Sequence, residues 1–279
     1  MTTTSGGTDQ QGHVELGGVT ATGTDTWRVA VRVPAMAHLP REAGLPVLHG
    51  LDLVRRLGQL VANRCLGVPG DHELVVSRMD FHRTGRPLRL PPAGSIGASA
   101  FVHVHDLQER RGTVRAFDAS MVLRVGSQEV AHGGGAARCL DPTTYTLLRR
   151  DTPAAPPRHD VEHLLDVRRR GDRLLAQVGW DAADPLMSAR SDRISALALA
   201  AGALRAAQVL RPGRDVTGVS LSLDRFVDCA PPPDLLAHAA QDAVEVSVLA
   251  RRTVAARSTV RLAPAREPAG PVRDLLRGP

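Results

Sequence analysis

The chain has 279 residues, of which 43% are hydrophobic, and its formal charge is +6, so two globular domains of ordinary size are expected. All 35 basic residues are arginines spread along the chain, and only 3% of residues are aromatic, which argues against a stacking platform for nucleic acid. Arg205 interrupts the longest apolar run, so no membrane-spanning segment is expected either.

The N-terminal part begins with a polar segment and continues into a strand. Residues 1–13 are small and polar, without a basic start or an apolar core, which predicts a disordered tail and not a signal peptide. The residues from Trp27 to Val33 alternate between apolar and polar types, as in a strand with one buried face.

A long helix is predicted next, between Pro46 and a stop at Gly67–Gly70. One face of this helix is apolar, because apolar residues recur at steps of three and four: Val47, Leu48, Leu51, Val54, Leu57, Leu60 and Val61. A second line along the helix is polar and consists of Asp52, Arg55 or Arg56, Gln59 and Asn63.

Several strands are predicted after this helix, at residues 73–81, 99–105, 113–125 and 127–131. The run Gly133–Gly135 lacks the Lys-Ser/Thr of a phosphate loop, so it predicts a bulge or a turn. Residues 139–149 close this part of the chain, and the Pro-rich residues 151–159 predict a linker. The first domain is therefore expected to span residues 14–150.

The pattern then repeats, which predicts a second domain at residues 160–264. A helix is expected at about 192–210, and the run Arg168–Asp172 predicts a charged hairpin turn. The expected strands of this domain lie at residues 161–167, 173–180, 221–224, 244–249 and 254–262. Residues 265–279 are charged and rich in Pro and Gly, which predicts a loose tail.

The segment around the first helix resembles known families. His38 lies fourteen positions before Asp52 (52 − 38), and a His before a Pro/Gly-rich turn with an acid inside the next helix resembles the acid–base pair of hotdog-fold acyl-thioester dehydratases. The wider segment resembles the A-factor synthase (AfsA-like) family, in which a Val-Pro pair and a His precede a helix of the form LLLxExxRQAxxLLAHRxYGVP. The matching residues are Val33-Pro34, His38, Asp52 at the family's Glu, Arg55 at its Arg, Arg56 at its Gln, and Ala62 to Pro69.

The resemblance implies an α+β fold of two tandem hotdog units, each an antiparallel sheet wrapped around a long central helix. It implies an acyltransferase that moves a β-ketoacyl group from an acyl carrier protein thioester to the hydroxyl of dihydroxyacetone phosphate, in γ-butyrolactone and butenolide biosynthesis. In this hypothesis Asp52 activates the hydroxyl and His38 assists proton transfer. Arg55 and Arg56 are candidates for binding phosphate, because guanidinium binds phosphate oxygens bidentately.

Further candidates lie at the two helix starts. Amides near His49 and Gly50 are expected to polarise the thioester carbonyl, because helix-start N–H groups lack partners within the helix. In the second half, Ala201 stands where the family's second helix has its Glu, so one of the two sites is expected to lack its acid. Arg190, Asp192 or Arg193 are the candidates for completing the other site.

Each of these residues also has a structural interpretation. Asp52 can be bonded to Arg55 or Arg56 at helical i+3 or i+4 spacing, the arginines can lie on a solvated helix face, and Gly50 can allow close packing. Two other functions also fit the sequence. One is a hotdog dehydratase, thioesterase or transferase to another acceptor, and the other is a non-catalytic protein that binds a ligand or a partner.

No redox cofactor or metal is required by this chemistry. His103 and His105 alternate on a predicted strand without a third ligand at suitable spacing, so they are interpreted as surface residues. Three cysteines without CxxC spacing predict reduced thiols in a cytoplasmic protein. The expected partners are an acyl carrier protein or coenzyme A thioester and a hydroxyl acceptor such as dihydroxyacetone phosphate. A basic surface would help to dock an acidic carrier protein.

Overall fold

The structure is a computed structural model that describes residues 14–34, 45–85, 94–152, 162–179 and 193–264. The two predicted tails and nearly all of the predicted linker lie outside these described residues, as do the site candidates His38, Arg190 and Asp192.

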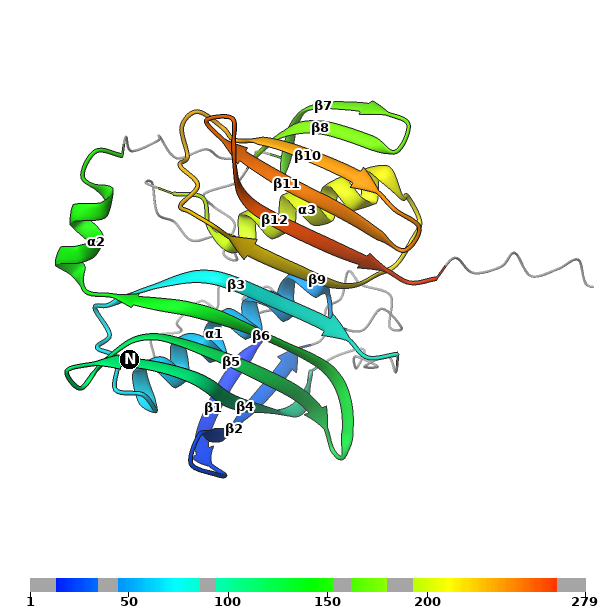
Figure 1. Ribbon diagram of the computed structural model, residues 1–279. Helices are drawn as coiled ribbons and strands as arrows, with labels where there is room; N and C mark the ends of the chain where they lie inside the picture. Colours follow the sequence, from blue (N-terminus) through cyan, green and yellow to red (C-terminus); the bar gives the residue numbers. More distant parts are fainter. Residues whose placement is uncertain (1–13, 35–44, 86–93, 153–161, 180–192, 265–279) are drawn as a thin grey trace, which may run out of the picture.

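The described residues form one large antiparallel sheet and three helices (Figure 1). The helices are α1 (Val47–Arg64), α2 (Pro142–Arg149) and α3 (Ala196–Leu210). The strands are β1 (Glu15–Ala21), β2 (Thr26–Pro34), β3 (Glu73–Arg83), β4 (Ser95–Arg110), β5 (Thr113–Val125), β6 (Gln128–Leu140), β7 (Leu164–Arg170), β8 (Arg173–Val178), β9 (Val216–Leu223), β10 (Asp234–Ala239), β11 (Ala243–Ala250) and β12 (Thr253–Leu262).

The order of the strands repeats from the two edges of the sheet towards its middle. The sheet runs β1-β2-β4-β5-β6-β3-β9-β12-β11-β10-β8-β7, so β3 and β9 meet at the centre and each stands in the same place within its own half. Met79 of β3 faces Leu221 of β9 across this junction, and Phe81 faces Val219. The internal repeat predicted from the sequence is therefore also present in the topology.

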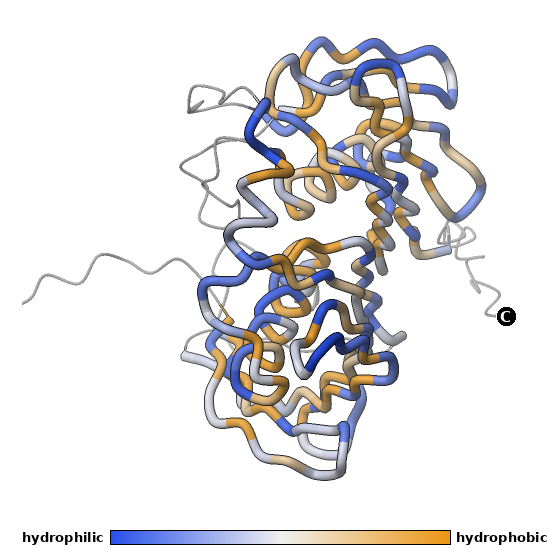
Figure 2. The backbone as a smooth tube through the Cα atoms, turned by 60° about the vertical axis from the view of Figure 1, so that its left-hand side comes forward, coloured by the Kyte–Doolittle hydropathy of each residue, from blue (hydrophilic) through white to orange (hydrophobic). Residues whose placement is uncertain are grey.

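The two long helices lie on the same side of the sheet, and they contact one another (Figure 1). The strands alternate between buried and exposed residues, as β2 shows along its whole length, and Figure 2 shows this alternation as orange and blue segments. Because one face of the sheet is apolar, α1 and α3 cover it and form the core there. α1 keeps a polar line, whereas α3 buries ten residues and is rich in alanine.

α1 follows the prediction closely, since it begins directly after Pro46 and ends before Gly67, which has a φ of 68°. The hairpin predicted at Arg168–Asp172 also forms, between β7 and β8. No helix in the described part of the chain is long and apolar enough to cross a membrane.

The prediction of a bulge or turn at Gly133–Gly135 is wrong. These residues lie inside β6 and pair without a break with β3 and β5. A Cβ at Gly133 would lie 2.4 Å from the carbonyl oxygen of Asp80, and one at Gly134 would lie 2.6 Å from that of Ala119. The glycines are therefore required because the neighbouring strands approach closely, which is the second common reason for glycine in a strand.

Candidate functional site

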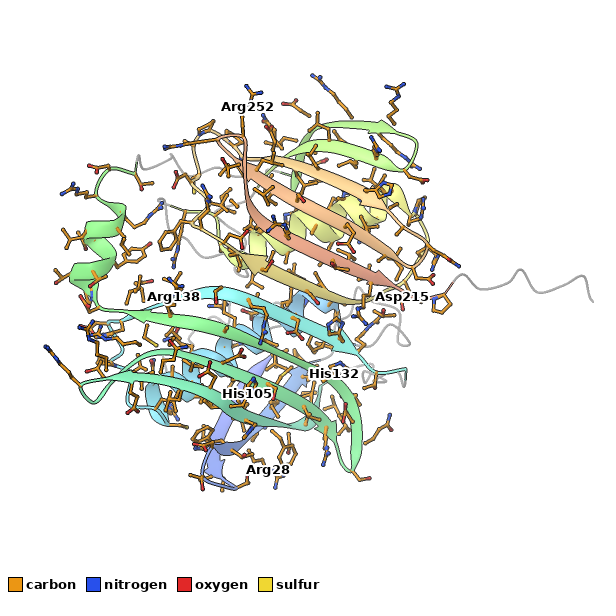
Figure 3. The ribbon with its side chains drawn as sticks, viewed as in Figure 1. Arg28, His105, His132, Arg138, Asp215 and Arg252 are labelled. Carbon is orange, nitrogen blue, oxygen red and sulfur yellow. The ribbon has the colours of Figure 1, made fainter. Side chains whose placement is uncertain are left out.

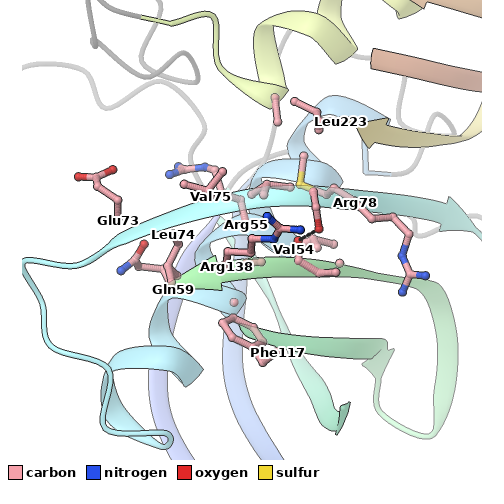
Figure 4. A pocket seen from close by; sticks show the side chains of 18 of the residues that line it. Val54, Arg55, Gln59, Glu73, Leu74, Val75, Arg78, Phe117, Arg138 and Leu223 are labelled. Carbon is pink, nitrogen blue, oxygen red and sulfur yellow. Dashed lines mark hydrogen bonds between the residues drawn. The ribbon is translucent and has the colours of Figure 1, made fainter. Parts of the chain in front are cut away.

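A cavity of about 650 Å³ lies between α1 and the apolar face of the first half of the sheet (Figure 4). The apolar part of its wall includes Val54, Leu57 and Gly58 of α1 and Phe117, Met121 and Ala137 of the strands. Along β3, residues 73–77 are only half-buried, whereas Met79 and Phe81 are buried, because α1 does not cover the beginning of this strand. A cavity of this volume with apolar walls is typical of a small-molecule site.

The second half of the chain supplies one side of this cavity. Arg193 to Ala196, at the start of α3, and Leu223 to Val227, after β9, contribute to its lining. The cavity therefore depends on both halves and lies beside the junction of β3 with β9.

The polar part of the lining carries more positive than negative charge. The arginines that line the cavity are Arg55, Arg78, Arg138, Arg193 and Arg225, and the acidic residues that line it are Glu73 and Asp224. Both acids are in ion pairs with arginine, Glu73 with Arg193 at 3.4 Å and Asp224 with Arg257 at 2.7 Å. Two more of the arginines are paired with acids that do not line the cavity, Arg55 with Asp52 and Arg78 with Asp118. The cavity therefore suits a ligand with an apolar part and an anionic part.

Among the acidic and basic residues that the structure describes, Asp52 is the one that is buried, with 4% of its surface exposed. It is not itself among the described residues that line the cavity, but its partner Arg55 is. Its Oδ1 accepts hydrogen bonds from Nη2 of Arg55 at 2.6 Å and from Nε of Arg55 at 3.1 Å. Its Oδ2 lies 3.9 Å from Nη1 of Arg56. The pairing along the helix that the spacing predicted is present, and it compensates a carboxylate that would be costly to bury alone.

The two neighbouring arginines have different positions. Arg55 lines the cavity, and Asp52 fixes its guanidinium from one side, so the remaining N–H groups can bind a ligand. Arg56 donates a hydrogen bond to the carbonyl oxygen of Val14 and is not among the described residues that line the cavity. Of the two arginines predicted to bind phosphate, the structure brings only Arg55 to the cavity.

The predicted role of Gly50 as an oxyanion donor is wrong. Its N–H donates a hydrogen bond to the carbonyl oxygen of Pro46 at 2.9 Å, so it is engaged within the helix. A Cβ at Gly50 would lie 2.3 to 2.4 Å from three ring carbons of Phe81, which explains why a glycine stands there. His49 occupies the first turn of α1 and is not among the described residues that line the cavity.

Of the three candidates at the start of the second helix, the described residues include only Arg193. Its guanidinium pairs with Glu73 and lies over the rings of Tyr145 at 5.2 Å and Phe226 at 5.4 Å. These contacts join the start of α3 to α2 and to the segment after β9, so Arg193 shapes the wall of the cavity and adds charge to it.

Several residues of the cavity were not predicted from the sequence, among them Gly58, Phe117 and Arg138. Phe117 and Ala137 are cross-strand partners, and Arg138 is the next residue along β6. The alternation along β5 indicates that Phe117 faces inwards, but no local signal places it opposite α1. Gly58 is recognisable in the sequence, because a glycine inside a helix lowers the stability of the helix. Its presence there indicates that packing or function requires a small residue at that position.

The other candidates are not brought together as a site. His103 contacts the Thr26 hydroxyl at 3.1 Å, and His105 lies 3.3 Å from a carboxylate oxygen of Asp118. The described residues contain no group of three or more His, Cys, Asp or Glu side chains that could hold a metal ion. Burial raises the pKa of the Cys139 thiol to about 11, so this cysteine is not a nucleophile at neutral pH.

A cluster of histidines and acids lies on the face of the sheet that points away from α1 and α3, where Figure 3 shows His105 and His132. The rings of His82 and His132 have their centres 5.5 Å apart and are tilted by 36°, and Nε2 of His82 lies 3.8 Å from a carboxylate oxygen of Asp80. Burial, together with the smaller effects of the charges on Arg261 and His132, lowers the pKa of His82 from 6.5 to about 4. Burial conversely raises the pKa of Asp80.

This pKa shift predicts that acid destabilises the protein. Between pH 6.5 and about pH 4 the unfolded state binds a proton at this histidine and the folded state does not, so stability falls as the pH falls. Urea unfolding measures the free energy of unfolding at pH 7 and at pH 4.5. Between these two pH values the wild type should lose up to about 3 kcal/mol more of this free energy than His82→Gln. The opposite contribution of Asp80 is present in both proteins and largely cancels. Equal losses in the two proteins would show that His82 does not cause the effect.

No protein-family model and no curated protein sequence matches the chain. Solved structures do resemble it. A protein provisionally described as an oleoyl thioesterase from Lactobacillus plantarum has a TM-score of 0.52 and 11% identity, over 86% of this chain and 97% of that one. The 12:0-ACP thioesterase from Umbellularia californica has a TM-score of 0.52 and 10% identity, over 88% of this chain and 100% of that one. Together with the large antiparallel sheet and the few helices, these likenesses show a hotdog fold.

Proposed function

We propose that this protein is an enzyme that acts on acyl thioesters and binds the acyl chain in the cavity between α1 and the sheet. Three features support the proposal. Part of the cavity wall is apolar, five arginines line the cavity, and a buried carboxylate, Asp52, lies on the helix that forms one wall. The fold is also one in which thioesterases occur, as the two similar structures indicate.

In this proposal the chain consists of two tandem hotdog units, at residues 14–150 and 160–264, and the unit built on α1 carries the working site. The repeated strand order supports the division. The unit built on α3 has a buried alanine, Ala201, where the resemblance to the A-factor synthase family places the acid of the second helix. Its Ala-rich helix supplies packing and has no carboxylate of its own.

The reaction that we propose is transfer of a β-ketoacyl group from an acyl carrier protein or coenzyme A thioester to the hydroxyl of dihydroxyacetone phosphate. The hydroxyl oxygen forms a bond to the thioester carbonyl carbon, the C–S bond breaks, and the hydroxyl proton is transferred to the departing thiolate. The step is redox-neutral and therefore needs no redox cofactor. The resemblance of residues 33–69 to the A-factor synthase family supports this choice of acceptor.

The residues have the following roles in this mechanism. Asp52 takes the proton of the hydroxyl, and His38, which lies outside the described residues, assists the proton transfer. Arg55 binds the phosphate of the acceptor. The observation that carries the proposal is Arg55 itself, because a buried carboxylate fixes its guanidinium at an apolar cavity.

The test is thiol release from a β-ketoacyl thioester, measured with and without dihydroxyacetone phosphate. Release that depends on the phosphate ester, with the acylated phosphate ester or its butenolide product detected by mass spectrometry, supports the transferase. Release without an acceptor would indicate a thioesterase, and loss of water from a β-hydroxyacyl thioester would indicate a dehydratase. Absence of all three activities, with carrier-bound substrates also tried, would refute an enzymatic function and favour a binding protein.

Arg55 and Arg56 provide a matched pair for testing acceptor binding. Arg55→Gln should raise KM for dihydroxyacetone phosphate about tenfold or more, because a hydrogen bond to a charged group is lost. Arg56→Gln should leave this KM within about twofold of the wild type, because Arg56 contacts Val14 and Asp52 and not the cavity. Steady-state kinetics with varied acceptor measures both values. Equal effects of the two substitutions would remove Arg55 from the acceptor site.

A further inference from the structure

α1 contains two glycines, and packing explains only one of them. A Cβ at Gly50 would overlap the ring of Phe81, whereas a Cβ at Gly58 would have no heavy atom within 4 Å. Gly58 is also not at a turn, since it lies in the middle of α1. An alanine would fit at this position and would favour the helix. Gly58 therefore lowers the stability of the helix with no compensating contact in the described part of the chain.

The space beside Gly58 is a local gap in a buried face. Val54 and Ala62 lie one helical turn before and after Gly58 on the same face of α1, and they are 8% and 0% exposed. Gly58 and Val54 both line the cavity. The helix is therefore closely packed one turn before and one turn after Gly58, whereas the space beside Gly58 itself is not filled.

The wall opposite α1 is also built from small residues. Ala119 of β5 and Gly135 of β6 are cross-strand partners that line the cavity, and Ala137 lies two residues further along β6. A Cβ at Gly135 would lie 2.9 Å from the carbonyl oxygen of Arg78, so close strand packing explains this glycine. Gly58 thus faces a wall that is already shallow, and a side chain there would reduce the width of the cavity.

The polar and apolar ends of the cavity are adjacent along the helix. Arg55 precedes Gly58 by three residues, so their positions are neighbours on the surface of α1, about 5–6 Å apart. An acyl chain whose thioester group lies beside the acceptor site at Arg55 would extend its tail past Gly58 between α1 and β5.

We propose that Gly58 is a specificity-determining residue that keeps the cavity open for a medium or long acyl chain. An acyl chain that reaches Gly58 gains apolar burial there, and a short chain that ends at the rim does not. The protein therefore discriminates in favour of longer acyl groups, such as decanoyl, over short ones, such as butyryl. The thioester part of this ligand rests on the proposed function, whereas the binding of an apolar chain does not.

The test uses Gly58→Leu and measures binding of decanoyl and butyryl thioether analogues of coenzyme A, which cannot be turned over. The leucine should weaken binding of the decanoyl analogue about tenfold or more, because it displaces at least two methylene groups from the cavity. Binding of the butyryl analogue should change less than about twofold, because the short chain ends before Gly58. Gly18→Leu is the control, since Gly18 on β1 also has no atom near its Cβ and does not line the cavity.

A second variant, with a smaller side chain, keeps the test valid if the protein does not fold with a leucine at position 58. Gly58→Ala should weaken binding of the decanoyl analogue about fourfold and raise the midpoint of thermal unfolding. Unchanged binding, or an equal loss for both analogues, would overturn the inference. A wild type that binds the decanoyl analogue and turns over no thioester would refute the proposed enzyme and leave this inference standing.

Discussion

Replacing Asp52 with asparagine is expected to lower the rate of acyl transfer on the order of a hundredfold or more, because the carboxylate that takes the hydroxyl proton is lost. The protein should remain folded, since asparagine has nearly the same shape and its amide oxygen can still accept a hydrogen bond from Arg55. The cost in stability should be about 1 kcal/mol, because Arg55 is partly exposed and water can solvate its guanidinium. Steady-state kinetics and urea unfolding of the same preparation measure the two effects.

The structure also gives Asp52 a second role, as the residue that positions Arg55, and the two roles have different signatures. Loss of a base lowers kcat and changes the pH–rate profile while KM for the acceptor stays the same. Loss of positioning raises this KM, and Asp52→Asn combined with Arg55→Gln is then no worse than Arg55→Gln alone. A fully active Asp52→Asn variant would remove the carboxylate from the mechanism.

Replacing Gly50 with alanine is expected to destabilise the protein by about 1–3 kcal/mol, although alanine is the better helix former. The added Cβ would lie 2.3 Å from Cε1 of Phe81, and Phe81 is fully buried between α1 and the sheet, so the ring cannot move away without disturbing its neighbours. Urea unfolding measures the change. The same substitution at Gly58, two helical turns later, should stabilise the protein by up to about 1 kcal/mol.

The two alanine substitutions are expected to change the stability in opposite directions, and this difference tests the packing of α1 against β3. Phe81→Leu removes the ring atoms that the new Cβ would meet, so Gly50→Ala should cost less in that background than in the wild type. An unchanged cost would mean that Phe81 is not the obstacle. Stabilisation by both alanines would mean that the helix lies further from β3 than the structure places it.

Where local chemistry decides, the sequence predicted the elements well. α1 has a proline before its first residue and a glycine with positive φ after its last, and an apolar stripe between them specifies which face is buried. β10 was not predicted, because its six residues follow a run of prolines that resembles a loop. Gly133–Gly135 was misinterpreted for a related reason. Glycine marks both turns and close approaches, and only the neighbouring strands distinguish the two.

The candidate site was likewise predictable only where spacing along one element decides the contact. The pairing of Asp52 with Arg55 follows from their spacing on one helix, and it forms as expected. The cavity does not follow from spacing, since Phe117, Ala137 and Arg138 reach it through strand pairing. The choice between Arg55 and Arg56 also depends on tertiary structure, because the carbonyl of Val14, more than forty residues away, binds Arg56.

The junction of β3 with β9 has a consequence for how the molecule responds to dilution. Two halves that met as separate chains would come apart at low concentration, and the cavity, which takes residues from both, would be lost with them. Here the connection along one chain holds the halves at a fixed effective concentration. Substitutions in α3 are also not copied into α1, as they would be in a homodimer. α3 can therefore consist almost entirely of residues that pack in the core while α1 keeps its polar line.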